Sequence, residues 1–333
     1  MPIQAIASAV PARVEDARAI AEATGSDVDF IMNKVGIRQR HVLGSDESGV
    51  DLAEAACRRL FETNGIKPGG IELLVFVTQT PDYPIPHNSA LLAARLGMDI
   101  HLAAFDINLG CSGYVYALSL VEHMLAGEGF ETGLLVTCDP YSKIVAKDDK
   151  ATNAVFGDAA TATLIQRSGG IATVGRCDYG TDGRGHDALI REVGGARHPL
   201  LAEAGAAAPI YDREAVRLKM KGREVFNFVL GRIPESVNRC LARNDLSLVQ
   251  IDRFAFHQGS RQMVHQLAAR IGAPAEKLLF NIDRYGNTVS STIPLLLEDE
   301  IARRPAPGCR ILVSGFGVGL SWATNVVTLG SHG

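Results

Sequence analysis

Three polar side chains of this sequence could together carry out acyl chemistry: Cys111, His257 and Asn287. A cysteine thiolate is a strong nucleophile towards thioesters and can hold an acyl group. An imidazole can donate an N–H, and an asparagine amide donates through its NH₂ but cannot act as a base. Such a set suits capture of an acyl group on sulfur and stabilisation of a developing oxyanion by two N–H donors. A hydrolase would more naturally use its histidine as a base oriented by an Asp or Asn, as papain-like proteases do.

Cys111 lies where a strand is expected to turn into a helix. The apolar run 102–105 predicts a buried strand, and the pattern over 114–127 predicts a helix. We expect the helix dipole and free backbone N–H groups to lower the pKa of the thiol. The flanking Gly110 and Gly113 are expected to permit close approach of a ligand. The alternative is a buried structural cysteine, which is the commoner fate of an isolated one.

His257 and Asn287 stand at two similar turns. His257 closes the apolar run 254–256, and Ser260 is suited to cap a helix over 261–271. Taken singly, His257 could be a hydrogen-bonded strand-end histidine and Asn287 a helix cap. Ligands of parallel α/β sheets bind outside the carboxyl ends of the strands, so three polar residues at such ends favour a site.

A glycine-rich stretch near the end of the chain offers a further set of N–H donors. The segment 315–319 follows an expected strand over 310–314 and reads Gly-Phe-Gly-Val-Gly. A turn there would supply backbone N–H groups to a second oxyanion hole. The alternative is a glycine-rich β-turn with no function.

The elements needed to position these residues can be predicted from hydrophobic periodicity. Residues 181–212 are expected to form a surface excursion, and 220–244 a long helix or a helix pair interrupted at Pro234. The run 73–78 suits a central parallel strand buried on both faces. The other expected elements are strands at 3–10, 102–107, 133–138 and 159–166, and helices at 15–24, 28–35, 51–64 and 88–96.

The sequence also contains an internal repeat. Leu-Ala-Ala-Arg-Leu-Gly at 92–97 reappears as Leu-Ala-Ala-Arg-Ile-Gly at 267–272, and the same order of strands and helices surrounds each copy. Carried forward, this offset places Cys111 opposite residue 286, next to Asn287. We infer a duplicated α/β unit with pseudo-two-fold symmetry, its halves at 1–170 and 171–333.

Composition excludes several classes of protein. The chain has 333 residues, is 47% hydrophobic and carries a net charge of −4. This overall charge does not indicate a nucleic-acid-binding protein. No apolar run reaches the length of a membrane span, and residues 1–5 do not begin a signal peptide. The six cysteines form no CxxC pair or Cys/His cluster, so we expect no metal and no cofactor, in a reduced cytoplasmic protein.

As an ordered set, the motifs of the chain resemble the β-ketoacyl-[acyl-carrier-protein] synthase III family. The similarity extends from about residue 3 to residue 329 and implies the thiolase fold, a five-layered αβαβα arrangement, usually as a homodimer. The motifs are Gly36-Ile37-Arg38-Gln39-Arg40-His41, Asp106 with Gly110-Cys111-Ser112-Gly113, Phe156-Gly157-Asp158-Ala159-Ala160, Met220-Lys221-Gly222-Arg223-Glu224-Val225-Phe226, His257-Gln258, Gly286-Asn287-Thr288 with Ile293-Pro294, and Gly315-Phe316-Gly317.

The resemblance implies a role for each site residue. Cys111 would take an acyl group from acyl-CoA, and His257 and Asn287 would donate to the carbonyl of a malonyl thioester, on acyl carrier protein or CoA, while carbon dioxide leaves. The resulting carbanion would attack the acyl-cysteine and give a 3-oxoacyl thioester. The backbone N–H groups of Cys111 and Val318, beside Gly317, would hold the oxyanion of acyl transfer.

The resemblance also implies residues that bind the substrates. Phe30 matches a tryptophan that stacks on adenine, and Lys34 and Lys150 match arginines near the CoA phosphates. Ile85 matches a residue that reaches across the dimer and limits acyl-chain length, and Phe316 is expected to line the substrate pocket. Arg261 is the candidate for docking the carrier protein, because Gln262 replaces the arginine that relatives use.

The chain departs from the family pattern at further positions. Gly259 and Ser260 follow His257-Gln258 in place of the usual Ala-Asn, and Val318 replaces a glycine. These departures bear on the substrate and leave open fatty acid synthesis or a specialised lipid or polyketide pathway. Two other activities also stay open: transfer of the acyl group from Cys111 to an alcohol or amine, and a non-catalytic partner subunit.

Overall fold

The computed structural model describes residues 2–200 and 216–330, and its strands form a continuous mixed sheet that folds back on itself. The strand order is β12-β13-β14-β8-β1-β7-β6-β4-β5, with β9 also pairing with β14. The strands are β1 (Pro2–Ala9), β4 (Leu73–Val77), β5 (Ala103–Ile107), β6 (Thr132–Cys138), β7 (Ala160–Gln166), β8 (Ala172–Val174), β9 (Asp178–Thr181), β12 (Arg253–Phe256), β13 (Arg310–Gly317) and β14 (Ser321–Leu329).

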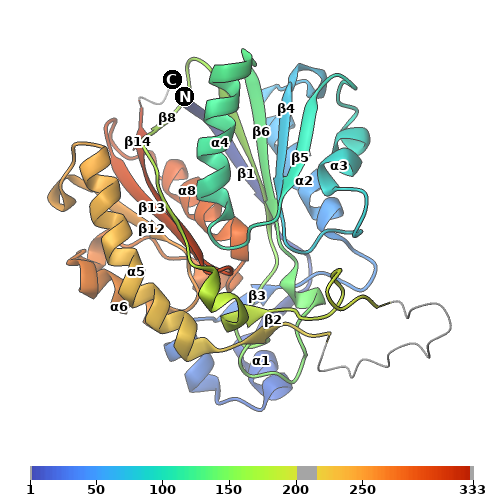
Figure 1. Cartoon of the computed structure of the whole chain (residues 1–333), viewed down its shortest axis with the longest axis vertical. Helices are drawn as coiled ribbons and strands as arrows, with labels where there is room; N and C mark the ends of the chain where they lie inside the picture. Colours follow the sequence, from blue (N-terminus) through green and yellow to red (C-terminus); the bar gives the residue numbers. More distant parts are fainter. Residues whose placement is uncertain (1, 201–215, 331–333) are drawn as a thin grey trace.

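The helices cover both outer faces of the folded sheet and fill the space inside it (Figure 1). They are α1 (Ala17–Thr24), α2 (Gly49–Asn64), α3 (Asn88–Leu96), α4 (Gly113–Glu128), α5 (Gly222–Arg243), α6 (Arg261–Ile271), α7 (Ile282–Tyr285) and α8 (Thr292–Ala302). Shorter helical turns are η1 (Phe30–Val35), η2 (Pro68–Gly70), η3 (Tyr141–Lys143), η4 (Gly183–Ala188), η5 (Leu248–Gln250), η6 (Ala275–Lys277) and η7 (Val289–Ser291). Two small hairpins pair β2 (Val14–Asp16) with β3 (Gln39–His41), and β10 (Leu189–Ile190) with β11 (Lys219–Met220).

Alternating side chains of each half-sheet face two different cores, which gives the five layers predicted above. In β4, Leu73 and Val75 join the central core, whereas Leu74 and Phe76 pack under α2 and α3. The same division holds in the other half, where α5 and α6 cover the outer face. Helices α4 and α8 lie between the two half-sheets and are shared by both (Figure 1). The order of layers is therefore helix, sheet, helix, sheet, helix.

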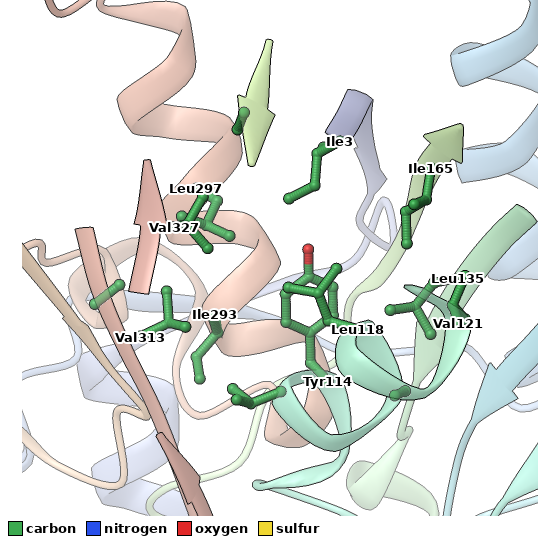
Figure 2. Packing of buried hydrophobic residues seen from close by; sticks show 14 of the residues in the cluster. Ile3, Tyr114, Leu118, Val121, Leu135, Ile165, Ile293, Leu297, Val313 and Val327 are labelled. Atoms are coloured by element: carbon green, nitrogen blue, oxygen red, sulfur yellow. The ribbon is translucent and has the colours of Figure 1, made fainter. Parts of the chain in front are cut away.

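The central core joins the two halves of the chain (Figure 2). Tyr114, Leu118 and Val121 of α4 pack with Ile293 and Leu297 of α8 and with residues of both half-sheets. All of these side chains are fully buried or nearly so. Burying an aliphatic side chain contributes about 1.5–3 kcal/mol each, so this layer is a main source of cohesion between the halves.

The predicted repeat is present, with one difference. The order β4, α3, β5, α4, β6 in the first half corresponds to β12, α6, α8, β13 in the second. Where the second half should have a counterpart of β5, Leu278 makes only an isolated parallel bridge to Phe254. The expected short strand is therefore reduced to a single bridge.

Several element predictions need correction. The 102–105 run gives an edge strand, β5, that pairs only with β4 and is half-buried. Of the two alternatives for 220–244, the single long helix is confirmed: α5 continues through Pro234, with Val229, Ile233 and Val237 packed on the sheet, and the expected break at Pro234 is absent. No helix in the described ranges is long and apolar enough to cross a membrane.

The expected surface excursion at 181–212 is also partly wrong. Residues 201–212 lie outside the described residues, whereas residues 181–200 are described. Within that earlier part, Leu189 of β10 is buried in the cluster around Cys111. The segment therefore contributes to the interior as well as the surface.

A buried arginine links the N-terminal segment to the loop that precedes β7. Arg40 is 2% exposed and donates to the carbonyl oxygen of Asn153, to that of Phe156 at 2.7 Å and to the Glu15 carboxylate at 2.7 Å. Phe156 in turn forms a parallel bridge with Asn287. Arg40 therefore supports the backbone that positions one of the three candidate site residues.

We predict that Arg40→Ala lowers the free energy of unfolding by about 3 kcal/mol or more, because it leaves buried carbonyl groups and a carboxylate without their donor. The matched control is Arg13→Ala, which removes the other arginine bound to Glu15, at 2.6 Å, from an exposed position. That control should cost less than about 1 kcal/mol. Denaturant unfolding of both variants checks the prediction, and equal losses would contradict it.

Candidate active site

The structure brings Cys111, His257 and Asn287 to one cavity of about 440 Å³. Cys111 follows β5, and His257 follows β12, so two of the residues lie past the carboxyl ends of strands as predicted, but the prediction of a strand end is wrong for Asn287. Asn287 lies between α7 and the turn η7. Phe316 and Gly317 line the same cavity.

Cys111 lies in an apolar cluster that closes the bottom of the site. Its buried neighbours include Phe156, Leu189, Leu218 and Val289. Burial, followed by the charge of Asp139, raises the pKa of the Cys111 thiol to about 12, against the lowering effect of the backbone N–H groups of Cys111 and Val318. The expectation of a lowered pKa is therefore wrong for this state of the protein, because the loss of solvent outweighs the N–H groups at the sulfur.

The glycines beside Cys111 admit protein side chains. A Cβ at Gly110 would lie 2.4 Å from Gln79 Oε1, and one at Gly113 would lie 2.4 Å from Val77 Cγ1. The space that we expected to admit a ligand is therefore occupied by the side chains of Val77 in β4 and of Gln79 just after it. These glycines allow the start of α4 to pack closely on the sheet.

The last strand hairpin supplies the wall next to the sulfur. β13 continues through Gly317, which pairs with Ser321, so the expected turn over 315–319 begins only at Val318. A Cβ at Gly317 would lie 2.9 Å from Cys111 Sγ, so only glycine leaves the sulfur room there. The Val318 N–H is at the sulfur, where it can also face an oxyanion formed on an acyl group.

His257 is a neutral donor or acceptor in this site. Its ring is buried and lies edge-on to Phe316, with ring centroids 5.7 Å apart. Burial lowers its pKa to about 3, and a backbone contact with Val289 only partly opposes this. At neutral pH the ring therefore carries one N–H and no charge.

Asn287 is fixed so that its NH₂ group is left for the cavity. Its backbone N–H donates to the carbonyl of Val155 at 2.9 Å, and its own carbonyl accepts from Gly157 at 3.0 Å. Its side-chain Oδ1 accepts the N–H of Val289 at 2.9 Å. With Oδ1 engaged by the backbone, the NH₂ group is the part of the amide that is left to donate to a ligand in the cavity that Asn287 lines.

The exposed residues that line the cavity, which we take as its mouth, include cations and an aromatic ring. Phe30, which is 45% exposed, lines it together with the exposed Lys34 and Lys150. Arg223 of α5 is a fourth lining residue there. Its motif was recognised in the sequence, but the residue received no role, because only the fold brings the start of α5 to the site.

Two of the predicted residues lie elsewhere. Ile85 is 87% exposed and does not line the cavity. Arg261 is half-buried, with its guanidinium over the Phe280 ring at 5.6 Å, and it is Gln262 that faces the cavity. Sequence reasoning also missed the apolar wall of the cavity formed by Leu189, whose surroundings in the chain show no periodic pattern.

The arrangement combines a nucleophile with two neutral donors in a pocket whose walls near the sulfur are apolar. In low dielectric, N–H donors aimed at a developing oxyanion stabilise it more than they would in water. Neither His257 nor Asn287 brings a charge that would attract bulk water or a carboxylate. The chemistry that fits is acyl capture on Cys111 followed by stabilisation of an enolate at the two donors.

Comparison with known proteins finds relatives along nearly the whole chain. The family profile of the 3-oxoacyl-[acyl-carrier-protein (ACP)] synthase III matches residues 105–183, and the profile of its C-terminal part matches residues 241–329. The beta-ketoacyl-[acyl-carrier-protein] synthase III of Acaryochloris marina is 31% identical over 320 residues, which cover 96% of this chain and 94% of that protein.

Solved structures resemble the whole chain. A 3-oxoacyl-(acyl-carrier-protein) synthase III crystal structure at 2.1 Å superposes with a TM-score of 0.90 and 36% identity, covering 98% of this chain and 99% of the other. The 3-oxoacyl-(acyl-carrier protein) synthase of Burkholderia xenovorans LB400 has a TM-score of 0.89 and 34% identity, covering 99% of this chain and 94% of the other.

We predict that alkylation of Cys111 by iodoacetamide keeps accelerating from pH 7 to pH 10. The raised pKa means that the thiolate fraction grows about tenfold per pH unit over this range. Mass spectrometry of the Cys111 peptide after timed labelling checks this, with glutathione as the reference thiol that levels off near its ordinary pKa. A rate for Cys111 that is already constant above pH 7 would contradict the prediction.

Proposed function

The chain belongs to the β-ketoacyl-[acyl-carrier-protein] synthase III family, and from that premise we propose how its own residues carry out the condensation. It is an acyl-transferring condensing enzyme with the thiolase fold. Our proposal assigns loading of the acyl group to Cys111 and decarboxylation of a malonyl thioester to His257 and Asn287.

In the loading step, the Cys111 sulfur attacks the carbonyl carbon of an acyl-CoA. A new carbon–sulfur bond forms, the bond to the CoA sulfur breaks, and the proton of the Cys111 thiol leaves with the CoA thiol. The backbone N–H groups of Cys111 and Val318 hold the oxyanion of the tetrahedral intermediate. Since the resting thiol is protonated, its deprotonation is coupled to substrate binding.

In the condensation step, a malonyl thioester occupies the same cavity. The His257 N–H and the Asn287 NH₂ donate to its thioester carbonyl, the bond to the carboxylate carbon breaks, and carbon dioxide leaves. The electron pair forms an enolate, whose carbon attacks the acyl carbonyl on Cys111. The carbon–sulfur bond to Cys111 then breaks, which releases a 3-oxoacyl thioester and a Cys111 thiolate. A proton taken up from water restores the resting thiol.

The observation that carries this proposal is the fixed orientation of Asn287. Its Oδ1 is engaged by the Val289 N–H, so the NH₂ group is the donor that it presents to the cavity. A donor there stabilises an enolate oxygen but cannot orient a catalytic histidine as a base for hydrolysis. We further propose that the half formed by residues 1–170 supplies the nucleophile and the half formed by residues 171–333 supplies both side-chain donors.

For substrates, we propose an acyl-CoA and a malonyl group on acyl carrier protein, with malonyl-CoA as the alternative extender. Phe30 would stack on the adenine, and Lys34 and Lys150 would face the phosphates, since all three line the mouth of the cavity. Arg261, the first residue of α6, is proposed to bind the carrier protein through its guanidinium group. We also propose a cytoplasmic location, where the CoA and carrier substrates are made and where free thiols stay reduced.

We propose that the active form is a homodimer built across the edge strand β5. β5 pairs only with β4 and leaves a row of backbone groups open on its other side. A second copy with the same edge could satisfy these groups. In that dimer, the exposed Ile85 would reach the partner's acyl pocket and limit its length.

We predict that Asn287→Ala leaves acyl loading within about threefold of the wild type but lowers condensation at least about 100-fold, the usual cost of one oxyanion donor. Cys111→Ala should abolish loading. Loading is measured as the mass adduct on Cys111 after incubation with acyl-CoA. Condensation is measured as carbon dioxide and 3-oxo product after addition of malonyl-carrier protein. Asn64→Ala, on the outer helix α2, is the matched control and should change neither.

The outcomes separate the possible activities. An adduct on wild-type Cys111 without carbon dioxide release would favour transfer to an alcohol or amine. No adduct with any acyl-chain length would leave only a non-catalytic role. Equal loss of loading and condensation in Asn287→Ala would contradict the role given to Asn287.

We predict that the chain has twice the mass of 35.5 kDa in solution by light scattering, and that Ala104→Pro reduces it to one chain. The Ala103 N–H donates to the carbonyl oxygen of Glu72, next to β4. Because successive N–H groups of a strand point to opposite sides, the N–H of Ala104 faces the open edge. Proline there removes an edge donor without breaking the pairing with β4. A monomeric wild type, or a variant that stays dimeric, would contradict the β5 interface.

A further inference from the structure

A strained turn lies directly behind the two side-chain donors. Val289 has φ +53°, a left-handed backbone conformation that is unfavourable for a β-branched residue, and it is fully buried. Such conformations persist only where the surrounding structure fixes them. They are concentrated at functional sites.

The turn touches all three parts of the proposed catalytic set. The Val289 N–H donates to Asn287 Oδ1 at 2.9 Å, and its backbone also contacts His257. Its side chain packs in the cluster of Cys111, where Cγ1 would be 3.1 Å from a Cβ at Gly110. A change of the Val289 dihedral angles would therefore rotate the group that fixes Asn287 and would alter the surroundings of His257.

The residues after Val289 bind buried groups of the first half. Ser290 Oγ donates to Asp139 Oδ2 at 2.5 Å. Ser291 Oγ lies 2.8 Å from Thr137 Oγ1 and donates to the carbonyl oxygen of Ala159 at 2.9 Å. These bonds connect η7 to the end of β6 and the start of β7. The sheet can therefore hold the strained turn in place.

Asp139 is itself fixed by burial and by a second hydrogen bond. It is fully buried, and it also accepts the backbone N–H of Gln79 at 2.6 Å, at the end of β4. It therefore joins the carboxyl ends of two neighbouring strands to the turn that orients Asn287. The catalytic steps described above make no use of this carboxyl group.

We propose that the hydrogen bond from Ser290 to Asp139 holds the left-handed turn at Val289, so that Ser290 and Asp139 are positioning residues for the donors Asn287 and His257. The proposal rests on the proposed function, since it concerns the decarboxylation step. Loss of the bond lets the turn relax towards an ordinary backbone conformation and moves the Val289 N–H away from Asn287. Loading of Cys111 depends on other donors and is retained.

A double-mutant cycle of Ser290→Ala with Val289→Gly tests this. Glycine adopts the left-handed conformation without strain, so the turn no longer needs the hydrogen bond in its presence. We expect Ser290→Ala in the wild-type background to slow carbon dioxide release from malonyl-carrier protein roughly tenfold or more, and to slow it less than about threefold in the Val289→Gly background. Acyl loading of Cys111 should stay within about threefold throughout.

The matched control is Ser236→Ala, which removes another fully buried hydroxyl that donates to a buried carboxylate, Asp178, at 2.7 Å, away from the cavity. It is expected to lower thermal stability as Ser290→Ala does but to leave decarboxylation unchanged. Unequal effects of the two serines on decarboxylation at similar melting temperatures support positioning.

Two results would overturn the proposal, and they differ from failure of the proposed function. Equal effects of Ser290→Ala and Ser236→Ala on decarboxylation would reduce Ser290 to a structural role. An equal loss from Ser290→Ala in both Val289 backgrounds would show that the bond does not act through the turn. If the wild type loads an acyl group but releases no carbon dioxide, the proposed function fails first, and the positioning role fails with it.

Discussion

The structure depends on the burial of two apolar sheet faces against one shared layer of helices. Each half-sheet needs a helical cover on its inner side, and α4 and α8 supply that cover to both halves at once. Because the two helices share this layer, the turns that precede them meet at one place. Cys111 enters from the turn before α4, and Asn287 and Val289 enter from the turn before α8. The active site is thus a consequence of how the core is closed.

The same burial sets the electrostatics of the site. Removal of water raises the pKa of Cys111 and lowers that of His257, so both side chains rest in their neutral forms. A neutral histidine and an asparagine amide are suited to donate to an enolate without stabilising a competing carboxylate. The cost of the arrangement is a weakly ionised nucleophile. The backbone N–H groups of Cys111 and Val318 offset that cost in part, at the atom where charge develops.

Local sequence predicted much of the fold, and its failures have physical causes. The periodicity of α2, α3, α4 and α6 and the apolar run of β4 were read correctly, because burial on one face or two leaves a regular pattern. The edge position of β5 was missed, since an apolar run does not tell a central strand from an edge strand. Gly110 and Gly113 were read as room for a ligand, whereas Gln79 and Val77 from a distant strand occupy that room.

The sequence by itself determined which residues could act: a cysteine, a histidine and an asparagine at equivalent turns of a repeated unit. Residue type and order along the chain are enough for that, because they fix the available chemistry and the strand ends where it is placed. Only the tertiary structure decided the ionisation of Cys111, the direction of the Asn287 amide and the strain at Val289. The ionisation of Cys111 depends on burial by distant parts of the chain. The Asn287 amide is held by Val289, two positions further on, in a turn that Ser290 joins to Asp139, which lies more than a hundred positions away in the sequence, so no local pattern contains this contact.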